Sequence, residues 1–188
     1  GAIYFNAPTK ELTVENTKFI NTYSNDDQSQ KGGAIYVKFQ QDSMPITIKC
    51  CYFENTRSHY GGSIYIEWNA DSISPIIIDN CTFYKVKSKS NGYAIVIDSC
   101  HKNTVTISNC NFNDCADSKD YFTINLNVSN LNFLYNKIVD SKVEQCGGCV
   151  DLEKVGNHVF NGNLFQNYRF DDSDTDIKIS GGINCFIS

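Results

Sequence analysis

The chain has 188 residues, a net charge of −5 and 41% hydrophobic residues, so it is too apolar for a disordered chain and long enough to bury a core. It holds 20 Ile and 22 Asn but only 6 Leu and 6 Ala, which argues against a helical bundle because Asn favours turns and Ile favours strands. Lys and Arg are scattered and no apolar run reaches the ~18 residues of a membrane span, so neither nucleic-acid binding nor membrane insertion of this segment is expected.

In chain order, each unit of the sequence opens with a glycine-rich turn and a short strand of alternating apolar residues. A second alternating strand follows, and a third strand ends on Phe or Ile. Such alternation, bounded by clusters of Gly, Asn, Asp and Ser, predicts strands rather than helices. The first strands are expected at 1–5, 32–37, 61–66, 91–97 and 147–152, the second at 12–14, 46–48, 76–78, 105–107, 131–133 and 158–160, and the third at 17–19, 51–53, 81–83, 110–112, 136–138 and 163–165. The inward-facing column of the first strands also takes in Ile124, Leu126, Ile177 and Ile179.

The unit recurs at a nearly constant period, with 30 residues from Cys51 to Cys81 and 29 from Cys81 to Cys110. Strands that recur at the same phase can pair with their equivalents only in parallel, as in a β-helix. We therefore expect an all-β, right-handed, single-stranded parallel β-helix (solenoid) of about six coils of roughly 26–34 residues, with three short strands per coil. Residues 1–188 would form one domain that is a piece of a longer repeat region. The alternative is a β-propeller, whose blades have four strands.

The glycine-rich turns and the ends of the third strands carry a family resemblance. Gly-Gly-Ala-Ile at 32–35 and Gly-Gly-Ser-Ile at 61–64, with Phe-x-Asn at 19–21, 53–55 and 165–167, resemble the polymorphic outer membrane protein repeats of chlamydiae. Similar repeats occur in surface proteins of parasitic protists. The family's second motif has two residues between Phe and Asn, whereas this chain has one. The resemblance implies an extracellular or cell-surface segment that acts in adhesion or as a structural scaffold, with no catalytic residues to carry over. No cofactor is expected, because inward-facing side chains fill the interior of each coil.

Three cysteines, Cys51, Cys81 and Cys110, stand two residues before a Phe and therefore face the core with it. We expect them to pack as small buried hydrophobic residues rather than to form disulfides. Asn136 and Asn163 continue their column, which predicts a turn-edge position where Cys and Asn both fit. The other positions expected to be structural are Phe19, Phe53, Phe83, Phe112, Phe165, Gly33, Gly62, Gly92 and Gly148.

Two carboxylates provide the basis for an alternative function as an enzyme. Glu67 and Asp98 follow the first strands of neighbouring units, about one rung apart, near the ~5 Å at which paired carboxylates act in glycoside hydrolysis. A polysaccharide lyase or glycoside hydrolase would use them as an outer-face catalytic pair. The other interpretation is a solvated edge with Lys38 alongside.

No metal site is expected from the sequence. The pair Cys146 and Cys149 has the spacing of half a zinc site, but a second pair is missing. Residues 171–176 resemble the start of a calcium loop without its glycine or its final Glu.

Tyr4, Tyr36 and Tyr65 share one outward phase and predict an exposed aromatic ladder. Such a ladder could stack on sugar rings or anchor a protein, and it could equally stabilise neighbouring strands. The expected partners are therefore a glycan, a host-cell protein surface or another copy of this chain, the last by end-to-end association of open strand edges.

Two N-glycosylation sequons begin at Asn80 and Asn127. If a eukaryote secretes the protein, Asn127 is the expected acceptor, because the sequon at Asn80 contains Cys81, a predicted core residue.

Overall fold

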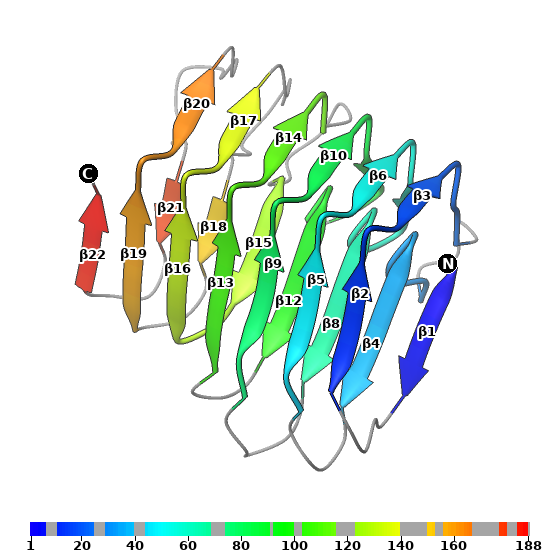
Figure 1. Cartoon of the computed structure of the whole chain (residues 1–188), viewed down its shortest axis with the longest axis horizontal. Coiled ribbons are helices and arrows are strands. Elements are labelled where there is room, and N and C mark those ends of the chain that lie inside the picture. The colour runs from blue at the N-terminus through cyan, green and yellow to red at the C-terminus, as the bar shows by residue number, and fades with distance from the viewer. Residues whose placement is uncertain are drawn as a thin grey trace.

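The computed structural model describes the chain over twelve ranges. These are residues 1–6, 11–24, 29–39, 44–68, 74–90, 92–99, 103–115, 123–139, 150–152, 156–166, 177–179 and 184–187. Strands and turns make up all of these ranges, and the strands stack side by side in long rows (Figure 1). Over the same ranges there is no helix long and apolar enough to cross a membrane.

Three parallel sheets run along the stack, and successive coils add one strand to each sheet (Figure 1). The first sheet contains β1 (Ile3–Asn6), β4 (Ile35–Phe39), β8 (Ile64–Trp68), β12 (Ile95–Ser99), β15 (Ile124–Asn127), β18 (Val150–Leu152) and β21 (Ile177–Ile179). The second contains β2 (Leu12–Glu15), β5 (Ile46–Lys49), β9 (Ile76–Asp79), β13 (Thr104–Ser108), β16 (Asn130–Leu134), β19 (Asn157–Asn161) and β22 (Asn184–Ile187). The third contains β3 (Lys18–Ile20), β6 (Tyr52–Glu54), β10 (Thr82–Tyr84), β14 (Asn111–Asn113), β17 (Lys137–Val139) and β20 (Leu164–Gln166).

The prediction of an all-β parallel β-helix with three strands per coil is confirmed. The coil count differs slightly from the expected six, because β21 and β22 belong to a further coil. A short two-stranded pairing of β7 (Arg57–Ser58) with β11 (Lys87–Ser88) was not predicted. It lies just before the glycine-rich turn that leads into the next coil.

The core consists of columns of like residues, because parallel pairing in register places each residue above its equivalent. In the first sheet, Ile35, Ile64, Ile95 and Ile124 pair in succession and are fully buried. Burying each such side chain contributes roughly 1.5–3 kcal/mol relative to leaving it exposed.

Aromatic rings form a second core column in the third sheet. The rings of Phe19 and Phe53 are 5.0 Å apart and nearly parallel, and the next two steps, to Phe83 and Phe112, are 4.8 and 4.7 Å. These separations equal the ~4.8 Å between paired strands, so one ring per coil fills the column. The column continues through Ile138 to Phe165, which is partly buried.

Left-handed backbone marks two corners of the coil, and five of the 22 asparagines stand at these corners. Residues at the corner before the third strand have φ between 51° and 65°; they are Asn16, Cys50, Asn80, Asn109, Tyr135 and Gly162. Residues at the corner after it have φ between 50° and 54°; they are Asn21, Asn55, Lys85 and Asp114. Asn tolerates this conformation better than most residues, which explains the Asn of the first two Phe-x-Asn motifs, Asn21 and Asn55.

The two glycines of the repeated turn have different roles. The first, Gly32 or Gly61, has φ near +60°. The second, Gly33 or Gly62, lies against the backbone of the next coil, where a Cβ would collide with the carbonyl oxygen of Arg57 or Lys87. β7 and β11 therefore exclude a side chain at the second position.

Gly92 stands at the first glycine position, because the register of β8 with β12 aligns it with Gly61. Its φ of 70° fits that position. The buried Tyr93 stands where the earlier coils have their second glycine. Gly148 lies outside the described residues.

Candidate functional site

The three tyrosines of the predicted ladder do stack across neighbouring coils. β1, β4 and β8 place Tyr4, Tyr36 and Tyr65 in register, with ring centroids 5.1 Å apart in the first step and 5.8 Å in the second. Tyr4 is 61% exposed, Tyr36 is half-buried, and Tyr65 is only 6% exposed. The prediction of three exposed rings is therefore wrong at Tyr65.

The cover over Tyr65 comes from the turn regions that precede the glycine-rich turns. The Lys31 ammonium lies 4.6 Å from the centre of the Tyr65 ring, and the Tyr60 ring meets it edge-on at 6.5 Å. A cation over an aromatic face is attracted by the negative potential of the ring. Lys31 is thus fixed beside the ladder.

Glu67 connects the ladder to two lysines. Its carboxylate accepts a 2.7 Å bond from Lys31 and a 2.8 Å bond from the Tyr36 hydroxyl, and Lys38 lies 3.5 Å away. Burial works to raise the pKa of Glu67, but these hydrogen bonds and the lysine charges together hold it below its usual value. Burial and the bond to Glu67 raise the pKa of Tyr36.

The surroundings of Glu67 are relevant to the predicted catalytic pair of Glu67 and Asp98. Strand pairing does place Asp98 beside Glu67, as expected. However, Asp98 accepts a 3.0 Å bond from the Asn127 amide, and Glu67 is kept ionised by its own partners. A general acid for glycoside hydrolysis needs a raised pKa, and Glu67 has a lowered one.

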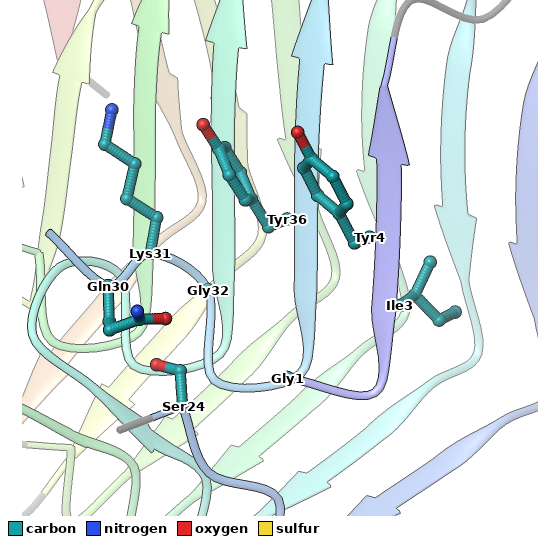
Figure 2. Close-up of a pocket in the computed structure, with 8 residues that line it drawn as sticks. All are labelled: Gly1, Ile3, Tyr4, Ser24, Gln30, Lys31, Gly32 and Tyr36. Atoms are coloured by element: carbon teal, nitrogen blue, oxygen red, sulfur yellow. The ribbon is translucent and has the colours of Figure 1, made fainter. Parts of the chain in front are cut away.

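A cleft of ≈ 250 Å³ opens beside the exposed end of the ladder (Figure 2). Tyr4 and Tyr36 line it with their rings side by side and their hydroxyls pointing the same way, and Lys31 extends next to Tyr36. Gln30 and Ser24 form its lower part in this view. The cleft therefore combines aromatic surface with a hydroxyl, an amide and an ammonium group.

Ser24 is the unusual member of the cleft. It is 8% exposed, and its hydroxyl oxygen has no hydrogen-bond partner within the described part of the chain. A buried polar group without a partner costs about 1–3 kcal/mol, so such groups are nearly always paired with protein, water or ligand. Ser24 thus offers an unused donor and acceptor to a molecule in the cleft.

The sequence did not predict that Ser24, Gln30 and Lys31 belong to the site. They precede the glycine-rich turn, in a stretch outside the strand alternation. Only their position just before Gly32 could have indicated this. Gly32 begins the turn into the strand that carries Tyr36, so residues before it lie near Tyr4 and Tyr36.

The cysteine column lies in the interior, away from the cleft. Cys51, Cys81 and Cys110 are buried free thiols, and Cys115 is a further one. The Sγ atoms of the first three point at carbonyl oxygens of the preceding coil, at 3.5, 3.6 and 3.7 Å. Hydrogen bonding with Cys110, together with burial, raises the pKa of Cys81 to about 12, so it stays a neutral thiol.

Within the described ranges, no group of three or more His, Cys, Asp or Glu residues is placed to hold a metal ion. The candidate half-site of Cys146 and Cys149 and the acidic segment 171–176 both lie outside the described residues.

Fold and site together define a parallel β-helix with an aromatic cleft on its first sheet. Comparison of the chain with protein-family models, with curated proteins and with solved structures finds no match.

Proposed function

We propose that this chain is a non-enzymatic segment of an extracellular or cell-surface protein, acting in adhesion, and that the cleft beside Tyr4 is its contact site for a glycan. The observation that carries the proposal is the cleft beside the edge strand β1, which Gly1 also lines, and the proposal requires this strand to stay uncovered in the whole protein. The cleft presents to the same space the exposed Tyr4 ring and the buried Ser24 hydroxyl, which has no hydrogen-bond partner among the described residues.

The chemistry of the cleft matches that of a sugar ring. One face of a pyranose carries C–H groups that pack on an aromatic ring, and its edge carries hydroxyls that both donate and accept hydrogen bonds. Tyr4 and Tyr36 supply the aromatic surface, and Ser24 and Gln30 supply groups that donate and accept. Lys31 adds donors beyond the one that it gives to Glu67.

The surface location rests on the resemblance of the Gly-Gly-x-Ile and Phe-x-Asn motifs to surface repeats. A regular β-helix also suits a scaffold that holds such a site away from a cell, because each coil adds roughly 4.8 Å of length. The resemblance and the cleft are independent supports for the adhesion role.

The test is a glycan array probed with the wild-type chain and with two variants. Tyr4→Ala removes the exposed ring of the cleft. Tyr135→Asn removes a ring that is 59% exposed elsewhere, at a corner with φ 55° that Asn tolerates. We expect Tyr4→Ala to lose binding and Tyr135→Asn to keep it. Equal binding by both variants would contradict the cleft's role.

A polysaccharide-acting enzyme is the second candidate, favoured by the register that sets Asp98 beside Glu67. The double variant Glu67→Gln/Asp98→Asn separates the two functions. If the chain is an adhesin, neither wild type nor variant turns over acidic or neutral glycans, and binding to the array persists. Turnover by wild type that the double variant lacks would replace our proposal with the enzyme.

A further inference from the structure

The sequon at Asn80 lies on a corner of the coil where its residues alternate between outside and inside. Asn80 is exposed at the turn between β9 and β10, with φ 51°. Cys81 is 1% exposed and faces the core, and Thr82 is half-buried on the outer side of β10. The buried cysteine that argued against this sequon thus points away from both residues that define it.

The sequon at Asn127 is in the opposite situation. Asn127 ends β15 in the first sheet, is half-buried, and donates its side-chain amide to Asp98 at 3.0 Å. A sugar on that amide would have to displace this bond. The neighbouring outward-facing position, Asn125, is 5% exposed, so this part of the sheet has little room for a glycan.

Glycosylation of the Asn80 amide would displace only a weak contact. It approaches the exposed Cys50 thiol at 3.4 Å, a weak contact, while the backbone N–H of Asn80 pairs with the Ser108 carbonyl in the next coil. A glycan on the side chain leaves that backbone bond and the core face of the corner unchanged.

We infer that Asn80 is an N-glycosylation site of this protein, used when the chain passes through a eukaryotic secretory pathway. The side-chain nitrogen of Asn80 forms a bond to the anomeric carbon of a lipid-pyrophosphate-linked oligosaccharide. The bond from that carbon to the pyrophosphate oxygen breaks, and the lipid pyrophosphate leaves while the amide gives up one proton. The inference rests on the extracellular part of the proposed function and is independent of what the cleft binds.

The position of Asn80 gives this modification a consequence. The corner joins the second sheet to the third, whereas Tyr4 and Tyr36 lie on strands of the first sheet. A glycan at Asn80 therefore covers one corner of the β-helix and leaves the cleft open.

The experiment is secretion of the chain behind a heterologous signal peptide from yeast or mammalian cells. Wild type, Asn80→Gln, Thr82→Val and Asn127→Gln are compared by gel mobility before and after peptide:N-glycosidase, and the modified peptide is identified by mass spectrometry. Thr82→Val removes the same sequon without changing the left-handed corner, so it decides the matter if Asn80→Gln fails to fold.

We expect one glycan on wild type, lost in Asn80→Gln and Thr82→Val and retained in Asn127→Gln. Secreted wild type without a glycan, or loss of the glycan in Asn127→Gln alone, would overturn the inference. Binding of the enzymatically deglycosylated wild type to the glycan array reports on the cleft separately, so the two proposals can fail independently.

Discussion

The side-chain oxygen of Asn136 accepts a 2.9 Å hydrogen bond from the backbone N–H of Cys110. Cys110 occupies the same corner as Asn136, one coil earlier. The Asn136 amide donates to the carbonyl of Ile107 at 2.8 Å, just as the Cys110 thiol points at the carbonyl of Ile78. The thiol and the amide are therefore both directed at the equivalent carbonyl oxygen of the preceding coil. The amide also satisfies the N–H of the preceding corner, which a thiol does less well because sulfur is a weak acceptor.

Asn136→Ala is expected to lower the free energy of unfolding by about 1–3 kcal/mol, because it leaves the buried N–H of Cys110 without its side-chain acceptor and removes the bond to the carbonyl of Ile107. Asn113→Ala, on the half-buried outer side of β14, is the matched control and should change little. Urea denaturation of both variants measures the difference. A loss below about 1 kcal/mol for Asn136→Ala would mean that these bonds do not stabilise the corner.

Phe83 lies in the middle of the stacked rings, between Phe53 and Phe112. Phe83→Ala should cost about 3–5 kcal/mol, since the rings above and below it cannot close the cavity. Thr82→Ala, the neighbouring residue on the outer side of β10, should cost less than about 1 kcal/mol. Similar losses for the two variants in denaturant would argue against a packed column.

Lys85 is an exposed residue with φ 52°, where a side chain is strained. Lys85→Gly should raise the free energy of unfolding by about 1 kcal/mol, because glycine adopts this conformation without steric cost. Lys85→Ala keeps the Cβ and should give no gain. Thermal unfolding of the two variants checks the prediction, and a lower midpoint for Lys85→Gly would show that the corner is not strained.

Burial raises the pKa of Cys115 from its ordinary 9.0 to about 12. Between these values the unfolded thiol loses its proton while the folded one keeps it, so stability present below pH 9 is lost as the pH rises toward 12. The expected decline is about 1.4 kcal/mol per pH unit for this thiol. Cys115→Ala should have a correspondingly flatter profile of unfolding free energy above pH 9. Identical slopes for the variant and wild type would show that the thiol ionises freely in the folded chain.

The strands, their parallel pairing and their register were predictable, because alternation defines each strand and the repeat period defines its partner. The repeated Phe positions, Phe19, Phe53 and Phe83, are enough to predict the register of the third sheet. The repeat phase also predicted that Cys110 and Asn136 occupy equivalent positions. It did not predict that both side chains point at a carbonyl oxygen of the preceding coil.

The turn regions could not be predicted, because their residues follow no alternation and their lengths vary. The pairing of Arg57 with Lys87 and the position of Lys31 over Tyr65 both depend on how those turns fold back on the first sheet. The burial of Tyr65 and the composition of the cleft, including Ser24, are consequences of that folding. Sequence alone could say which residues point outward, but not which of them are covered.

The most direct test of the account is the affinity of the strongest array glycan for wild type and for Tyr4→Ala, measured by titration calorimetry with Tyr135→Asn as the control. Loss of the Tyr4 ring should weaken binding at least about tenfold, equivalent to ~1.4 kcal/mol, while the control binds as wild type does. Unchanged affinity in Tyr4→Ala would contradict the assignment of the cleft as the glycan site.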